Sequence, residues 1–220
     1  EVALQALSLF LVGLRKTCYF GAEVRNKNWI ENPDTEIIYR LSIQNLGLVG
    51  FGRIARKLGF FMENLVNKIY FYDPYLKELP DLSDKYQSVE SLPDIFSQAK
   101  LVSIHAPLNP VTKRMIDEKS LSQAKEVILV NTSRADIIDR LVLEKALNSQ
   151  KVIFYGADVF WGEPPNFQDP WVCQFLKRKD VLITPHVGWY SRESERDLRR
   201  KAAEEVARVI KGGKPLNLLN

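Results

Sequence analysis

The chain has 220 residues, and its 45% hydrophobic and 26% charged content is typical of a folded globular protein with one large or two small domains. This composition excludes disorder, a collagen-like repeat and a coiled coil as the main architecture. The net charge of +4 is small for a chain of this length. It does not indicate a nucleic-acid partner, and we expect none.

Cysteine and histidine are scarce, with two residues of each type. The cysteines lie far apart and form no CxxC motif, so we expect neither a metal site nor a disulfide framework. The first apolar stretch, residues 2–14, is interrupted by Gln5 and Ser8 and has no basic residue before it. It therefore resembles neither a membrane span nor a signal peptide, and a reducing, cytoplasmic location is expected.

The first predicted element is a helix over residues 1–15, in which Val2, Ala6, Phe10 and Leu14 are close to helical spacing. No N-cap residue precedes it, and we interpret the chain as a fragment that starts inside a longer protein. The helix is so hydrophobic that exposure on a monomer is unfavourable. This property predicts a homodimer built through the domain.

The remaining elements alternate between short apolar runs and segments of helical periodicity. The runs predict buried strands at residues 46–49, 69–72, 101–104, 127–130, 152–155 and 181–183. The helical segments are 53–66, 91–98, 117–123, 140–148 and 192–211, the last with mixed charges typical of a solvated, salt-bridged face. Turn-forming residues predict loops at 31–35, 77–84, 162–170 and 212–215. This alternation predicts an α/β fold, a doubly wound parallel sheet with helices on both faces.

A glycine-rich turn at residues 50–55 follows the first predicted strand and opens a helix. Gly50 permits the tight turn, Gly52 lets the backbone approach a pyrophosphate, and Ala55 allows close packing of helix on strand. Asp73, at the end of the next strand, can accept hydrogen bonds from ribose hydroxyls and would repel a 2′-phosphate. The alternative is a glycine turn that binds nothing, but the strand, helix and acidic residue in sequence favour a dinucleotide site specific for NAD rather than NADP.

Arg134, Glu163 and His186 each follow a predicted strand, so all three are expected at one edge of the sheet. Arginine binds carboxylates, histidine exchanges protons near neutral pH, and glutamate can orient and stabilise a charged imidazole. Each residue also has a structural interpretation: Arg134 pairing with Asp136, Glu163 opening a proline loop, and His186 as a satisfied histidine after Pro185. Their joint occurrence favours a catalytic group.

Over essentially its whole length the sequence resembles the D-isomer-specific 2-hydroxyacid dehydrogenases. The matching segments are 46–54, 72–75, 105–109, 130–134, 157–160 with 163–164, and 184–188. The resemblance implies catalytic roles for Arg134, Glu163 and His186. It implies cofactor contacts for a larger set: Gly50, Gly52, Arg53, Ile54, Asp73, Ala106, Pro107, Asn109, Thr112, Thr132, Ser133, Arg134, Asp158, His186 and Gly188.

The activity implied by this resemblance is reversible hydride transfer between NAD and a small 2-hydroxy or 2-keto acid. Arg134 would hold the substrate carboxylate, His186 would protonate the carbonyl oxygen, and Glu163 would keep that histidine charged. Residues 1–187 would form the dinucleotide-binding domain, and residues 188–220 a helix and tail of a substrate domain that is largely missing from this chain.

Within the family, residues 72–75 and 186–191 look most like the branch of the C-terminal-binding-protein corepressors and their bacterial relatives. Trp189 would then border the substrate pocket, although packing at a domain junction explains it equally well. The alternative function is an NADH-sensing, corepressor-like interaction protein. One departure from the family is Ala135-Asp136 in place of paired glycines, which puts a carboxylate near Arg134 and is expected to weaken substrate anchoring.

Overall fold

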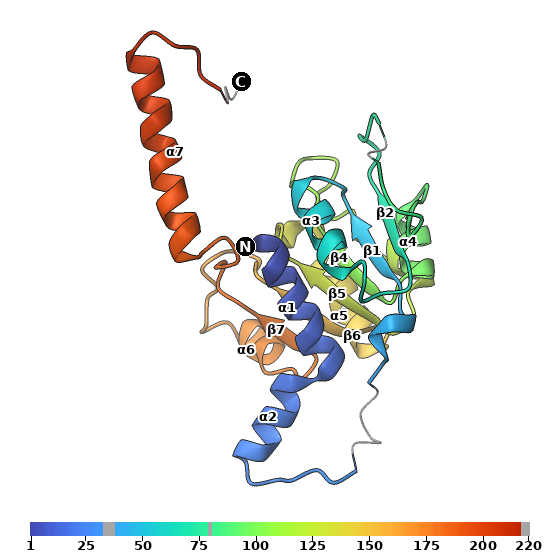
Figure 1. Ribbon diagram of the computed structural model, residues 1–220. Helices are drawn as coiled ribbons and strands as arrows, with labels where there is room; N and C mark the ends of the chain where they lie inside the picture. Colours follow the sequence, from blue (N-terminus) through green and yellow to red (C-terminus); the bar gives the residue numbers. More distant parts are fainter. Residues whose placement is uncertain (33–37, 79–80, 217–220) are drawn as a thin grey trace.

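The computed structural model describes residues 1–32, 38–78 and 81–216, and it is built on a single parallel sheet (Figure 1). The strand order is β3-β2-β1-β4-β5-β6-β7. From β1 the chain adds strands first on one side of the sheet and then, starting with β4, on the other side. The strands are β1 Leu46–Val49, β2 Ile69–Tyr72, β3 Tyr86–Ser88, β4 Leu101–Ile104, β5 Val127–Asn131, β6 Val152–Ala157 and β7 Val181–Ile183. This confirms the predicted doubly wound architecture, and the reversal marks the usual place for a ligand.

Helices cover both faces of the sheet and bury a separate core on each. The α-helices are α1 Val2–Arg15, α2 Thr17–Arg25, α3 Arg53–Met62, α4 Leu92–Gln98, α5 Arg140–Asn148, α6 Pro170–Leu176 and α7 Arg192–Ile210. Short 3₁₀ turns are η1 Leu41–Ile43, η2 Ser120–Gln123 and η3 Ala135–Ile137. One core lies under α1 and α3, and the other lies under α4, α5 and α6. The apolar character of the strands on both faces follows from this coverage.

Helix α1 lies against the sheet of its own chain. Ala6, Leu9, Phe10 and Leu14 are at most 3% exposed in the core under α1 and α3. The hydrophobicity that led us to predict a dimer is therefore satisfied within one molecule, and that reason for expecting a dimer is wrong. Leu4, which is 58% exposed, points away from this core.

Several predicted elements differ from the observed ones in their bounds or in their type. Helix α3 ends at Met62 rather than at residue 66, and residues 117–123 contain only the 3₁₀ turn η2. The strand β3 and the helices α2 and α6 were not expected. The predicted loop 162–170 reaches the start of α6, where Asp169 caps the helix by accepting a hydrogen bond from the Trp171 N–H at 2.8 Å. Residues 33–35 and 79–80 of two predicted loops lie outside the described residues.

Helix α7 projects away from the sheet (Figure 1), and none of its residues is buried. Ion pairs run along it, with Glu195 bonded to Arg199 at 2.6 Å and Arg200 to Glu204 at 2.8 Å. This confirms the predicted salt-bridged, solvated face. Within the described ranges, no helix combines the length and apolar character needed to cross a membrane.

Candidate active site

The glycine turn between β1 and α3 is shaped by two glycines with different surroundings. Gly50 has a φ of +85°, and a Cβ there would lie 3.0 Å from the backbone nitrogen of Ala106. For both reasons, any residue other than glycine would be strained at this position. At Gly52 a Cβ would meet no atom within 4 Å, so this backbone faces open space directly before α3. The arrangement leaves room for a pyrophosphate at the start of the helix.

Asp73 ties the end of β2 to this turn. One of its carboxylate oxygens accepts a hydrogen bond from the Phe51 N–H at 2.8 Å, and the other accepts one from the Tyr75 N–H at 3.0 Å. The carboxylate is therefore held in a defined position beside the glycine turn. Each carboxylate oxygen keeps a further lone pair for a ligand hydroxyl.

A cavity of about 530 Å³ opens beside Gly52. Of the predicted site residues, Gly52, Arg53, Ile54 and Trp189 line it. The lining also includes Ala55 of the glycine turn and His105 of the matching segment 105–109. Four further lining residues had no predicted role: Glu1, Val2, Ala3 and Lys57. Trp189 thus lines the same hollow as the glycine turn. It is 47% exposed, so it is not packed inside a domain junction within the described residues.

His105 is the most perturbed titratable group in this cavity. Both of its ring nitrogens are buried without a hydrogen-bond partner, and burial lowers the pKa of His105 to about 3. The imidazole is therefore neutral at physiological pH. The Oγ1 atom of Thr132 is likewise buried without a partner. Orphaned polar atoms of this kind are rare, and together with the open backbone of Gly52 they fit a polar, dinucleotide-sized ligand.

Two predicted cofactor residues, Asn109 and Thr112, hold their own loop together. The side-chain oxygen of Asn109 accepts hydrogen bonds from the backbone N–H groups of Val111 and Thr112, both at 2.9 Å. The Thr112 hydroxyl donates to the Pro107 carbonyl at 2.5 Å. Ala106, which is 9% exposed, begins this loop directly after His105. These side chains position the loop at the edge of the sheet.

The loop after β5 carries Arg134. Ser133 anchors it by donating from its hydroxyl to the Ile104 carbonyl at 2.9 Å and from its N–H to the Asn131 side chain at 2.9 Å. The Arg134 guanidinium donates to the Ser133 carbonyl at 2.7 Å and is otherwise exposed. No ion pair joins Arg134 to Asp136 in the part of the chain that the structure describes. Asp136 therefore does not compete with a substrate carboxylate for the guanidinium in this structure.

The structure brings Glu163 and His186 together. The Nδ1 atom of His186 lies 2.7 Å from one carboxylate oxygen of Glu163, and the Phe160 N–H donates to the other at 2.8 Å. Partial burial raises the pKa of Glu163, but these hydrogen bonds and the electrostatic influence of the neighbouring His186 and Arg134 side chains outweigh this effect. The net pKa is lowered, so Glu163 is an anion that orients the imidazole.

Asp158 organises the loop that carries His186. It is 3% exposed and accepts hydrogen bonds from the Thr184 hydroxyl at 2.5 Å, the Val187 N–H at 3.0 Å and the Gly188 N–H at 2.6 Å. A Cβ at Gly188 would lie 2.7 Å from this carboxylate. Three donors thus already occupy Asp158, which leaves at most one acceptor position for a cofactor.

Gln5 of α1 extends this network, and the sequence analysis gave it no role. Its side-chain amide donates to the Thr184 hydroxyl at 2.9 Å, across a separation of 179 positions. Glu1 accepts a hydrogen bond from Ser191 at 3.0 Å in the same region. No local pattern indicates either contact, because both depend on how α1 packs over β5 and β6.

These geometric features agree with a comparison with known proteins. Residues 7–188 match the model of the D-isomer specific 2-hydroxyacid dehydrogenase family, NAD binding domain. The chain belongs to this family. Its cofactor is NAD, and the open glycine turn, Asp73 and the orphaned atoms of His105 and Thr132 are the features that fit it. The described residues contain no group of three or more His, Cys, Asp or Glu side chains that could hold a metal.

Relatives of the domain are named as enzymes. The hydroxypyruvate reductase of Blautia hydrogenotrophica is 30% identical over 220 residues, which cover 98% of this chain and 66% of that protein. The D-3-phosphoglycerate dehydrogenase of Escherichia coli is 34% identical over 178 residues, which cover 80% of this chain and 43% of that protein. The matched part of the chain thus spans between 43% and 66% of the length of these relatives. They offer no support for the corepressor-like alternative.

Solved structures of the family have the same fold. A glyoxylate reductase from Paecilomyes thermophila superposes with a TM-score of 0.85 at 27% identity, covering 98% of this chain and 63% of the other. A D-lactate dehydrogenase with NAD⁺ from Lactobacillus jensenii superposes with a TM-score of 0.88 at 20% identity, covering 100% of this chain and 68% of the other. The second similarity establishes the fold alone.

Proposed function

We propose that this chain is the cofactor-binding part of an NAD-dependent oxidoreductase that interconverts small 2-hydroxy and 2-keto acids. The observation that carries the proposal is the hydrogen bond between Glu163 and His186 at the sheet edge that also holds the Gly52 cavity. A histidine oriented by an ionised carboxylate is suited to general acid-base catalysis. The relatives named as hydroxypyruvate reductase, D-3-phosphoglycerate dehydrogenase and glyoxylate reductase support this substrate class.

Three side chains would act on the substrate. His186 would donate a proton from Nε2 to the carbonyl oxygen during reduction and remove it during oxidation, because Nδ1 faces Glu163. Glu163 would stabilise the protonated imidazole. The exposed guanidinium of Arg134 would bind the substrate carboxylate with paired donors. When bound, NAD supplies or accepts the hydride.

The other predicted cofactor residues would position NAD. Arg53 and Ile54 follow Gly52 into α3, where Arg53 would neutralise pyrophosphate charge, and Asp73 would select the unphosphorylated ribose. Loop residues of the sets 106–112 and 132–134, with Asp158 and Gly188, would surround the remainder of the dinucleotide. Trp189, which lines the same hollow as Gly52, would border the substrate.

Residues 188–220 would belong with a substrate domain. The proposal rests on α7, whose Leu198, Val206, Val209 and Ile210 are between 49% and 80% exposed. A homodimer is also proposed, now on the exposed Leu4 and on α2, a helix without buried residues. The free thiols of Cys18 and Cys173 favour a reducing compartment, the cytoplasm.

The direct test combines binding and turnover. NADH titrated into the chain should show saturable binding by protein-to-NADH energy transfer, whereas turnover of 2-keto acids should be weak because a closing domain is needed for near-attack geometry. In a longer parent protein, His186→Ala should lower the rate by about 10²–10⁴-fold with little change in NADH affinity. A histidine variant that keeps its full rate contradicts the mechanism, and absence of NADH binding contradicts the cofactor assignment.

A further inference from the structure

Asn131 is the last residue of β5, and it is 0% exposed at the carboxyl edge of the sheet. Its backbone pairs with β4 on one side and with β6 on the other. Its carbonyl accepts a hydrogen bond at 3.0 Å from the N–H of Asp158, the carboxylate that organises the histidine loop. Asn131 therefore lies between the loops that carry Arg134 and His186, yet the mechanism above gives its side chain no part.

The side chain of Asn131 closes the arginine loop. Its Oδ1 atom accepts a hydrogen bond from the Ser133 N–H at 2.9 Å, and its Nδ2 atom donates to the Arg134 carbonyl at 3.0 Å. The same carbonyl accepts a hydrogen bond from the Ile137 N–H of η3 at 3.3 Å. The carboxamide thus fixes the backbone at both ends of the dipeptide Ser133-Arg134.

Both bonds require a carboxamide of this length, because it carries a donor and an acceptor on one carbon atom. An ionised carboxylate of the same shape would accept from the Ser133 N–H but would have no proton for the Arg134 carbonyl. A serine hydroxyl at position 131 could accept from the Ser133 N–H in a similar turn. It ends one bond earlier and would not reach the Arg134 carbonyl.

The direction of the Arg134 side chain depends on this backbone. The guanidinium is exposed, and its hydrogen bond at 2.7 Å goes to the carbonyl of Ser133, the residue directly before it. A paired contact with a carboxylate requires the plane of the guanidinium to face both carboxylate oxygens. A rotation of the dipeptide would turn the guanidinium and would cost one of the two hydrogen bonds.

We propose that Asn131 is a positioning residue, whose carboxamide holds the arginine loop so that Arg134 faces the substrate carboxylate. The proposal rests on the function proposed above, in which Arg134 binds that carboxylate. The Asn131 side chain is fully buried, so it acts through Arg134 and not by touching the substrate. Its loss should therefore weaken carboxylate binding more than cofactor binding.

Two substitutions test this proposal because they share one loss. Asn131→Asp and Asn131→Ser both keep an acceptor for the Ser133 N–H, and both lack the donor to the Arg134 carbonyl. The probe is oxamate, an unreactive analogue of a 2-keto acid, added to the NADH-saturated chain at mildly alkaline pH. Its binding is measured as protection of Arg134 from phenylglyoxal, quantified by mass spectrometry against sodium chloride of equal ionic strength. Protein-to-NADH energy transfer measures NADH affinity in the same samples.

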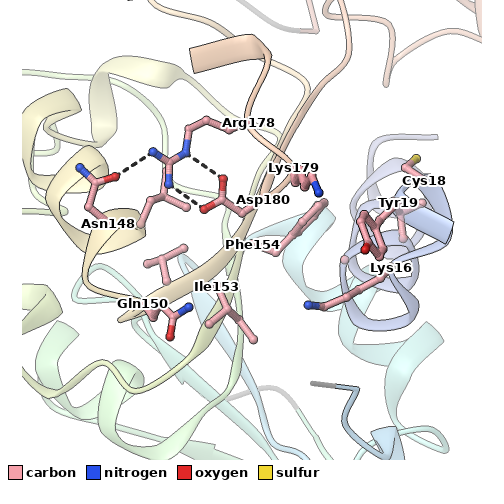
Figure 2. A pocket seen from close by; sticks show the side chains of 14 residues that line it. Lys16, Cys18, Tyr19, Asn148, Gln150, Ile153, Phe154, Arg178, Lys179 and Asp180 are labelled. Atoms are coloured by element: carbon pink, nitrogen blue, oxygen red, sulfur yellow. Dashed lines mark hydrogen bonds and ion pairs between the residues drawn. The ribbon is translucent and has the colours of Figure 1, made fainter. Parts of the chain in front are cut away.

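Oxamate should protect Arg134 saturably in the wild type, but not the exposed Arg199 of α7. Both variants should bind oxamate more weakly by about fivefold or more, which corresponds to about 1 kcal/mol, the usual contribution of one hydrogen bond. Their NADH affinity should change less than their oxamate affinity. Asn148→Asp is the matched control and should behave as the wild type. Asn148 lies at the opposite edge of the sheet, where its side-chain oxygen accepts a hydrogen bond from the Arg178 guanidinium at 2.8 Å (Figure 2).

The outcomes separate this proposal from the function on which it rests. A wild type whose Arg134 is not protected by millimolar oxamate would remove the carboxylate role of Arg134, and the role of Asn131 with it. If the wild type is protected and both variants bind oxamate equally well, only the role of Asn131 is refuted. A loss confined to one variant would refute it too, because the charge or size of that substitution would then be the cause. Equal losses of oxamate and NADH affinity, or unfolding of the variants at the assay temperature, would reduce Asn131 to a purely structural residue.

Discussion

The Nδ1 atom of His186 lies 2.7 Å from the carboxylate of Glu163, although the two residues belong to loops that follow different strands. His186 has a φ of +55°, a backbone conformation that is uncommon for a residue other than glycine. The Asp158 carboxylate holds the residues immediately after it, at Val187 and Gly188. The imidazole is thus placed by its own backbone and oriented by Glu163.

The lowered pKa of Glu163 predicts a pH-dependent contribution to stability. A carboxyl whose pKa falls on folding stabilises the protein above its unfolded value, near 4.5, and this stabilisation is lost as the pH drops through the lower folded value. Glu163→Gln should therefore unfold at a lower temperature than the wild type at pH 7, and the difference should shrink below pH 4. Thermal unfolding followed by circular dichroism measures it. Glu118→Gln, at an exposed position, is the control, and a difference independent of pH would contradict the assignment.

Two alanine substitutions in the glycine turn should have separate effects. Gly50→Ala forces a positive φ and a close contact with Ala106, so it should lower the free energy of unfolding by about 1–3 kcal/mol. Gly52→Ala meets no protein atom and should change stability by less than about 0.5 kcal/mol. It should nevertheless weaken NADH binding at least tenfold, because the methyl group would occupy the cofactor's space. Denaturant unfolding and NADH titration of both variants test this, and normal NADH affinity in Gly52→Ala would move the pyrophosphate elsewhere.

Asp73 should determine the choice between cofactors. We expect the wild type to bind NADH at least tenfold more tightly than NADPH, because the carboxylate repels a 2′-phosphate. Asp73→Ala should weaken NADH binding and reduce this preference. Parallel titrations with both cofactors measure it, with the exposed Asp84→Ala as a control. Tighter binding of NADPH by the wild type would remove Asp73 from this role.

Thr184 should stabilise the histidine loop through its hydroxyl. Thr184→Val removes the donor to Asp158 and the acceptor for Gln5, leaving a buried carboxylate oxygen with one partner fewer. The expected loss is about 1–3 kcal/mol of unfolding free energy. Thr184→Ser keeps the hydroxyl and is the matched control, with a loss below about 1 kcal/mol. Equal destabilisation of the two variants in urea would show that the methyl group, not the hydrogen bonds, matters.

Local patterns in the sequence determined the central strands, the glycine turn and the acidic residue after β2. Each is encoded by neighbours: branched apolar runs form buried strands, and a positive φ at Gly50 requires glycine. The same logic placed Arg134, Glu163 and His186 at one edge, because parallel strands share a direction. Strand β3 and helix α2 lack this signal, since β3 is a short, partly exposed edge strand and α2 has no buried face.

Only the tertiary structure decided how these parts are joined. The contact of Gln5 with Thr184, and through it with Asp158, spans nearly the whole chain and exists only because α1 packs over β5 and β6, next to the loop that follows β7. Packing also determined what covers the apolar face of α1, which the sequence alone could not distinguish from a dimer surface. Hydrophobic periodicity states that a face must be covered, but it does not state by what. The sheet of the same chain covers it.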